Sequence, residues 1–356
     1  MDKLVMLIIN PSTDYTDVAV FWEEEQQFST CIYHSHEELA KQGTLVMQKE
    51  LRIAAVKQTL QEQAIALDSI TAVVGPCGSL QGVESAVYPI IGYIIDELIK
   101  PSAANHAPAL GGLMAYELGN QLNVTSYVVD PLTVDEQAQF AKLSGLPGIE
   151  RRSLFHALNH KAIARRYAAE LGIEYENSRL IVAHLGMTIT VAAHLYGRVI
   201  DVNNALAGEG PFSPESSGSL PPLDIVRMCY SNDYTEQEMV EKITRGGGLT
   251  GYLGTNNLMR IQRMILDGDD FATLVLDAMA YQISKEICGM LAALEGRADI
   301  ILLTGGMAGS KWLVSAIKQR IVEIAPVKAY PGNEEVNAMA AKTWRAIRKR
   351  EGMGMY

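Results

Sequence analysis

The chain has few cysteines and no cysteine motif. Its four cysteines are Cys31, Cys77, Cys229 and Cys288. They lie too far apart for a zinc or redox motif, and four thiols in 356 residues do not resemble a disulfide framework. We therefore expect reduced, structural cysteines. Cys77 differs in its setting, because it lies between Pro76 and Gly78 in a predicted exposed turn.

Long apolar runs are also absent. The stretch 89–98 contains Asp96 and Glu97 and is far shorter than the roughly 20 residues that span a membrane. The first apolar run ends at Asn10 and lacks the length and the small-residue cleavage site of a signal peptide. We expect a cytoplasmic protein that does not bind membranes.

The chain has fewer positively than negatively charged residues. The chain has 30 Lys and Arg against 41 Asp and Glu, a formal net charge of -11. This balance argues against a nucleic-acid partner. With 48% apolar and 20% charged residues the composition is that of an ordinary globular protein, and 356 residues favour two domains.

A repeated pattern indicates how such domains are built. Two apolar runs, Leu7–Ile9 and Val18–Val20, flank a polar interval of eight residues, and the same arrangement recurs 173 residues later at Leu180–Val182 and Val191–Ala193. Each copy is typical of a strand, a turn and a strand. The pattern favours a duplicated lobe, with two unrelated hairpins as the alternative. Two such turns could hold opposite ends of one phosphate chain.

Strands and helices alternate along the rest of the chain, which predicts an α/β fold. Ser153 is predicted to cap a helix that runs to Leu171. His156 and His160 lie four residues apart on that helix, which is the spacing of zinc ligands, but Ala157 stands where a metalloprotease has its general base. We favour a structural pair of histidines over a metal site.

Two further features are candidates for phosphate or metal chemistry. Thr304-Gly305-Gly306 follows a predicted strand and precedes a helix, so its backbone could approach a nucleotide closely. Asp130 ends a strand and precedes Pro131. It is either a magnesium or catalytic carboxylate or a turn-forming aspartate.

The chain contains several long and distinctive motifs. The longest are Asp201–Glu215, Ser153–Asn159 and Ala278–Glu286, and shorter ones are Val128–Pro131, Tyr252–Asn256, Leu303–Gly306, Ala325–Val327 and Tyr330–Gly332. Together these motifs resemble those of butyrate kinases, and the resemblance covers essentially the whole chain. It implies the duplicated, two-lobed ribonuclease-H-like fold of actin-like ATPases, an α/β fold with a cleft between the lobes. The expected lobes are residues 1–152, completed by a C-terminal helix at 336–356, and residues 153–335.

The resemblance also implies a reaction. Such kinases transfer the γ-phosphoryl group of ATP, with Mg²⁺, to a short-chain carboxylate, or return it from the acyl phosphate. They rely on positioning and on neutralising the phosphoryl oxygens. As partners we expect the short-chain carboxylate or acyl phosphate and a homodimer or higher homo-oligomer, possibly including an active paralogue.

Position by position, the resemblance places Asn10 and Glu335 near the magnesium and the phosphates. It makes Asp130 a carboxylate that supports the metal and the transition state, and His156 a donor to the transferring phosphoryl group. The residues expected along the nucleotide are Gly186, Gly305, Gly306 and Met307.

The chain departs from the family pattern at anion-binding positions. Asp17 replaces a lysine in the first phosphate turn, and Pro76 and Ser216 each replace an arginine of the substrate cleft. Met187 and Thr188 replace glycines of the nucleotide turn. One positioned arginine can contribute roughly 10³ or more to the rate of phosphoryl transfer. We therefore expect weak or absent acyl-phosphate formation and poor ATP binding.

Three functions remain open at this point. The chain is an active carboxylate kinase with rearranged cations, a non-catalytic binding or regulatory subunit, or a kinase or phosphatase for another acyl substrate. For the first of these, Arg151, Arg152 and Arg245 are the candidates that could replace the missing arginines.

Overall fold

The structure, a computed structural model, describes residues 3–80, 83–100 and 107–356. The chain divides into two compact units. Unit 1 is Met1–Asp135 with Glu334–Tyr356, and unit 2 is Glu136–Asn333. Residues 136–152, which the sequence analysis placed in the first lobe, thus lie in unit 2.

Unit 1 contains a six-stranded sheet with the order β3-β2-β1-β4-β6-β5. Its strands are β1 (Val5–Pro11), β2 (Tyr15–Trp22), β3 (Glu25–Tyr33), β4 (Ala72–Pro76), β5 (Val87–Pro89) and β6 (Thr125–Val129). Strands β1 to β3 are antiparallel, whereas β4 is parallel to β1 and β6 is parallel to β4. Every residue of β1 is buried, as in a central strand covered on both faces.

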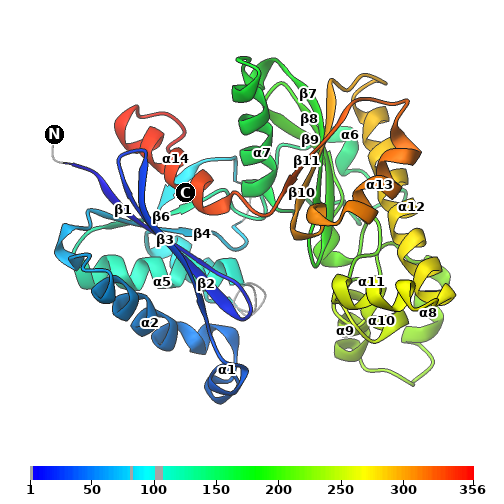
Figure 1. The fold of residues 1–356 in the computed structure, drawn as a ribbon, viewed down its shortest axis with the longest axis horizontal. Helices are drawn as coiled ribbons and strands as arrows, with labels where there is room; N and C mark the ends of the chain where they lie inside the picture. The colour runs from blue at the N-terminus through cyan, green and yellow to red at the C-terminus, as the bar shows by residue number, and fades with distance from the viewer. Residues whose placement is uncertain (1–2, 81–82, 101–106) are drawn as a thin grey trace. The chain divides into compact units, whose positions relative to one another are not determined.

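Helices cover both faces of this sheet. They are α1 (His36–Gln42), α2 (Lys49–Glu62), α3 (Gly92–Leu98), α5 (Ala107–Leu122) and α14 (Glu335–Arg348), with 3₁₀ turns η1 (Leu45–Gln48) and η2 (Leu67–Ser69). Leu7 and Ile9 pack with Leu110 and Met114 of α5. Helix α14 packs on β1 and β4, on the side of the sheet opposite α5 (Figure 1).

Unit 2 contains a five-stranded sheet with the order β11-β10-β7-β8-β9. Its strands are β7 (Arg179–Leu185), β8 (Ile189–Leu195), β9 (Arg198–Val202), β10 (Ile300–Gly305) and β11 (Val327–Pro331). Strands β7 to β9 are antiparallel, and β10 is parallel to both β7 and β11.

The helices of unit 2 also lie on both faces of its sheet. They are α6 (Gln139–Lys142), α7 (Ala157–Glu170), α8 (Pro222–Cys229), α9 (Glu236–Thr244), α10 (Gly248–Leu253), α11 (Leu258–Leu266), α12 (Asp270–Ala293) and α13 (Lys311–Ile321), with 3₁₀ turns η3 (Tyr175–Asn177), η4 (Ala205–Ala207) and η5 (Gly306–Gly309). Alternation along β7 assigns the faces, because Ile181 and Ala183 pack with α12, whereas Leu180 and Val182 pack with α7. Figure 1 shows α7 and α12 on opposite sides of this sheet.

The two sheets repeat one topology. Reading β1, β2, β3, β4 and β6 against β7, β8, β9, β10 and β11 gives the same strand order and the same strand directions. The duplication inferred from the 173-residue offset is therefore confirmed. The turns are shorter than the predicted eight-residue intervals, because β1 extends to Pro11 and β2 begins at Tyr15, while Leu185 and Ile189 bound the second turn.

Two smaller predictions concern the cysteines and membrane-spanning segments. The four cysteines are free thiols, as expected, but Cys77 is buried instead of lying in an exposed turn, and burial raises the pKa of its thiol. An inert side chain follows from that burial. No helix in the described part of the chain is long and apolar enough to cross a membrane.

Candidate functional site

The predicted site residues fall into two groups, one in each unit. In unit 1, Asn10 of β1 donates a hydrogen bond from Nδ2 to Oε2 of Glu335, the first residue of α14, at 2.9 Å. Asp17 of β2 is the direct cross-strand neighbour of Asn10. The structure thus brings these three residues together, although Asn10 and Glu335 lie more than 300 positions apart in the sequence.

This group is acidic. Burial raises the pKa of Glu335, the hydrogen bond from Asn10 opposes the rise, and the nearby Asp17 adds to it. Burial also raises the pKa of Asp17, against a hydrogen bond with Cys31. No ion pair to Asp17 is found within the described residues, so the position expected to carry a lysine supplies a second carboxyl group instead.

Arg52 holds the turn between Asn10 and Asp17. Its buried guanidinium donates to the carbonyl oxygens of Thr13 at 2.7 Å and Tyr15 at 2.8 Å, and to Oε1 of Gln48. Burial lowers its pKa to about 10. Because this guanidinium binds backbone carbonyl oxygens of the turn, it does not replace the missing lysine.

Asp130 follows β6 and contacts α14 at Lys342, two turns beyond Glu335. Its carboxylate accepts hydrogen bonds from Ser85 Oγ at 2.8 Å and from the ammonium of Lys342, which also donates to Ser85 at 2.7 Å. The Asp130 side chain is 2% exposed and that of Lys342 13% exposed. Asp130 has φ of 41°, in the left-handed region that aspartate tolerates.

These contacts decide how unit 1 could hold magnesium. Mg²⁺ needs one or two carboxylates and completes its shell with water and phosphate oxygens. Glu335 and the amide of Asn10 suit that role. For Asp130, Oδ1 already binds an ammonium group. Within residues 3–80, 83–100 and 107–356, no group of three or more His, Cys, Asp or Glu side chains is arranged to hold a metal by itself.

Unit 2 holds His156 at the start of α7. The helix begins at Ala157, so His156 is its N-cap residue, and Ser153 lies before the helix instead of capping it. The ring of His156 stacks on that of His184 with centroids 3.9 Å apart. His184 is fixed in turn by Asn159, whose Nδ2 lies 2.7 Å from His184 Nδ1.

Further histidines extend this pair into the core. His160 and His194 stack with an interplanar angle of 1°, and both side chains are fully buried. Thr190 lies between His156 and His160, and the hydroxyl of Tyr175 reaches His194. The interpretation of His156 and His160 as structural therefore describes only part of a four-histidine cluster: His156, His160, His184 and His194.

Burial keeps this cluster uncharged. It lowers the pKa of His156 to about 4 and that of His194 to about 3, and it lowers the pKa values of His160 and His184 as well. Neutral imidazoles donate hydrogen bonds without supplying the positive charge that the absent arginines would bring.

The burial of His194 predicts a pH-dependent stability. The unfolded state binds a proton on this ring below about pH 6.5, whereas the folded state does so only near pH 3, so stability falls as the pH falls through that window. The slope is about 1.4 kcal/mol per pH unit. We expect His194→Gln to reduce the pH dependence of the unfolding free energy between pH 6 and pH 5 by about that slope. Urea titrations of both proteins measure it, and equal slopes would contradict it.

The predicted nucleotide residues lie beside this cluster. Gly186, Met187 and Thr188 form the turn between β7 and β8, and Met187 is 51% exposed. Gly305 ends β10 with φ of +88°, where a Cβ would lie 2.5 Å from the carbonyl oxygen of Leu185. A Cβ on Gly306 would meet no atom within 4 Å. Met307 is buried in η5.

The loop from 203 to 221 closes on the same turn. Ser213 Oγ donates to the carbonyl oxygen of Met187 at 2.6 Å. Ser216 is 2% exposed, and its backbone N–H donates to Ser213 Oγ at 2.9 Å. The position expected to carry an arginine is thus occupied by a tightly packed serine.

Of the three arginines that could replace the missing ones, Arg151 is already paired. The guanidinium of Arg151 binds Asp201 at 2.9 Å and Glu209 at 2.6 Å, so its charge is neutralised locally. Arg152 and Arg245 are exposed on the surface. In unit 1, Pro76 is the buried last residue of β4 and packs against Gly111 of α5.

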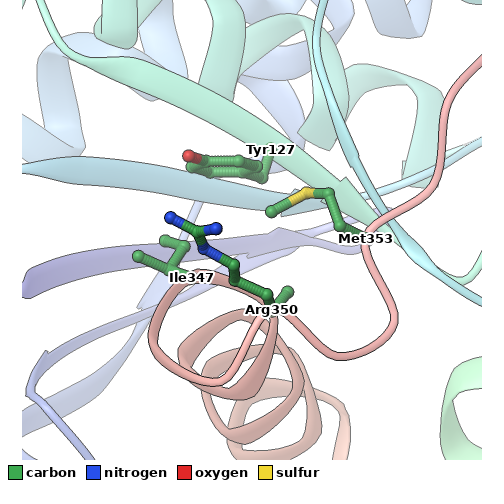
Figure 2. A pocket seen from close by; sticks show the side chains of 5 residues that line it. Tyr127, Ile347, Arg350 and Met353 are labelled. Atoms are coloured by element: carbon green, nitrogen blue, oxygen red, sulfur yellow. The ribbon is translucent and has the colours of Figure 1, made fainter.

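A separate open pocket of about 410 Å³ lies in unit 1 and is lined by Tyr127, Ala346, Ile347, Arg350 and Met353. Figure 2 shows Arg350 and Met353 beside the ring of Tyr127. None of the predicted site residues lines it, so it is not part of the candidate site.

The duplicated sheets have the α/β fold of the actin-like ATPase type. The model of the acetokinase family matches residues 142–343, more than half of the chain. The chain therefore belongs to the acetokinase family.

Solved structures agree on the fold. An acetate kinase from Porphyromonas gingivalis superposes with a TM-score of 0.77 at 17% identity, covering 96% of this chain and 99% of that one. A propionate kinase from Francisella tularensis gives 0.76 at 15% identity, with 96% and 99% coverage. An acetate kinase from Entamoeba histolytica gives 0.76 at 17% identity, with 94% and 97% coverage.

Sequence reasoning missed several residues of the site. Lys342 follows Glu335 by seven residues and so lies on the same face of α14, which is a signal that helical periodicity offers. Thr190 and Tyr175 have no local signal, because their partners come from other elements. Arg52 likewise reaches the turn from a distant helix.

Proposed function

We propose that this protein is a butyrate-kinase-like carboxylate kinase whose acyl-phosphate formation is weak or absent. The family reaction is transfer of a phosphoryl group between ATP and a short-chain carboxylate. The observation that carries the proposal is the charge of the site: Asp17 is a carboxyl group, Pro76 and Ser216 are uncharged and buried, and Arg151 is neutralised by two carboxylates.

The chain retains other parts of the reaction. His156 can donate a hydrogen bond to a phosphoryl oxygen, and the Asn10–Glu335 pair can hold a magnesium ion that accompanies the nucleotide. Magnesium would supply positive charge to the transferring group. The missing arginines would have stabilised the same oxygens in the transition state, where charge stabilisation has its largest effect on rate.

The nucleotide side is also altered. Met187 and Thr188 present side chains where the backbone has to approach phosphate oxygens, and Met187 is half exposed. Because glycines at such turns allow this approach, we infer weakened ATP binding. ATP and Mg²⁺ remain the expected ligands.

An acyl-hydroxamate assay with ATP, Mg²⁺ and butyrate at high protein concentration tests the proposal. Ordinary kinases turn over at about 1–100 s⁻¹, and we expect a rate at least about 10³-fold lower. An active acetate kinase assayed in parallel validates the conditions. Residual product belongs to this site only if His156→Asn removes it, and turnover at an ordinary kinase rate would disprove the proposal.

A non-catalytic binding or regulatory subunit is the second candidate. Unit 2 supports it with large apolar side chains exposed on α8, at its C-cap and on α11: Leu223 (69%), Tyr230 (83%), Met259 (72%) and Leu266 (85%). Exposed apolar groups of this kind suit an interface with a second copy or an active paralogue. Complete absence of product in the same assay would favour this candidate.

A further inference from the structure

A hydrogen-bonded chain of five side chains runs through unit 2 and ends at His156. Tyr175 Oη lies 2.7 Å from His194 Nδ1, and His194 Nε2 lies 3.4 Å from His160 Nδ1. His160 Nε2 lies 2.8 Å from Thr190 Oγ1, which lies 3.0 Å from His156 Nδ1. Tyr175, His160, His194 and Thr190 are buried.

The hydrogen bonds from Tyr175 to His156 can all point in one direction or all in the other. Each neutral imidazole has one N–H donor and one acceptor nitrogen, and each hydroxyl has one proton. Orienting one bond therefore orients the neighbouring imidazoles, and the direction passes through Thr190 when its single hydroxyl proton points to a histidine of the chain. The orientation therefore decides which nitrogen of His156 carries its proton.

The Tyr175 end of the chain selects a direction. The phenol of Tyr175 is the more acidic partner and donates to Nδ1 of His194. His194 then donates from Nε2 to Nδ1 of His160, and His160 donates from Nε2 to Thr190 Oγ1. This leaves the Thr190 hydroxyl proton to donate to Nδ1 of His156.

We propose that this chain fixes His156 as the tautomer protonated on Nε2, and that Thr190 is the positioning residue that transmits the orientation. Because Nδ1 is occupied as an acceptor, Nε2–H is the donor that His156 offers to a ligand. Its closest recorded partner is Thr188 Oγ1 at 3.5 Å, a long contact that an anion can displace. The opposite orientation would turn a lone pair toward the phosphoryl oxygens.

A separate contact determines the tautomer of His184 in the same way. An amide N–H₂ group only donates, so Asn159 Nδ2 makes His184 Nδ1 an acceptor and places the His184 proton on Nε2. The stacked rings of His156 and His184 therefore present two N–H donors to one anion. The use of these donors on a phosphoryl group rests on the proposed function, whereas the tautomers do not.

The test is a two-bond ¹H–¹⁵N correlation spectrum of the full chain with labelled histidine at pH 7. We expect a pyrrole-like Nε2 and a pyridine-like Nδ1 for His156, His160, His184 and His194. A pyridine-like Nε2 on His156, His160 or His194 in the wild-type protein would overturn the proposal, and this measurement needs no variant.

Matched variants then test Thr190. Thr190→Val removes the hydroxyl, and we expect the two His156 nitrogens to shift to intermediate positions as the tautomers mix. Thr190→Ser keeps the hydroxyl and should restore the wild-type signals. Tyr167→Phe, which removes a hydroxyl from the same small core without touching the chain, should leave them unchanged. Wild-type His156 signals in Thr190→Val would refute the role of Thr190.

The two proposals fail separately. Butyrate turnover at an ordinary kinase rate would disprove the weak activity while leaving the tautomers as inferred. Conversely, a wrong His156 tautomer would overturn this inference whatever the hydroxamate assay shows.

Discussion

Replacing Lys342 by methionine is expected to destabilise unit 1 by about 3–5 kcal/mol, because it leaves a buried carboxylate without its cation. Asp130 is 2% exposed, and Lys342 and Ser85 are the partners recorded for its Oδ1. The low exposure of the Asp130 side chain limits the access of water that could replace the ammonium group. Urea denaturation of Lys342→Met and of the wild-type protein measures the difference.

Two variants separate loss of the ion pair from loss of a side chain. Asp130→Asn combined with Lys342→Met removes both charges, and we expect it to recover at least half of the lost stability. Lys349→Met changes an exposed lysine next to the end of the same helix, over the ring of Trp344, and should cost about 1 kcal/mol or less. A loss of under about 1 kcal/mol in Lys342→Met would show that the pair contributes little.

The second large effect is expected at Gly305. A Cβ there would lie 2.5 Å from the carbonyl oxygen of Leu185, at a φ of +88° that an L-residue rarely adopts. We expect Gly305→Ala to cost about 2–4 kcal/mol, since strain and a backbone clash add. Thermal unfolding followed by circular dichroism detects such a change as a fall in Tm.

Gly306→Ala is the matched control. A methyl group at Gly306 meets nothing within 4 Å, so we expect a change within about 0.5 kcal/mol. Equal losses in the two variants would show that the glycines matter through chain flexibility and not through the close approach of β10 to Leu185.

The sequence predicted the architecture because its signal is local and repeated. The two strand pairs lie at one fixed offset, and the apolar alternation along Leu180, Ile181 and Val182 already separates the two faces of a sheet. The start of α7 was less predictable. Ser153 is a good capping residue, but the helix begins only after His156, whose contacts with Thr190 and His184 are tertiary.

The candidate site was harder to predict than the fold. A motif identifies Asp130 and His156 as chemical groups, but their charge state depends on partners that the motif does not include. Lys342 neutralises the first, and burial keeps the second uncharged. Ser216 and Pro76 could be recognised in the sequence as substitutions. The ion pairs of Arg151 with Asp201 and Glu209 could be recognised only in the folded structure.

Unit 1 is built from two separate segments of the chain, so its parts are synthesised at different times. Its sheet comes from the first 135 residues, but α14 is translated only after all of unit 2. Until α14 leaves the ribosome, Asp130 lacks Lys342 and Asn10 lacks Glu335. Unit 2, which is one continuous segment, can therefore complete its fold before the unit that begins the chain, the reverse of the usual N-terminal-first order.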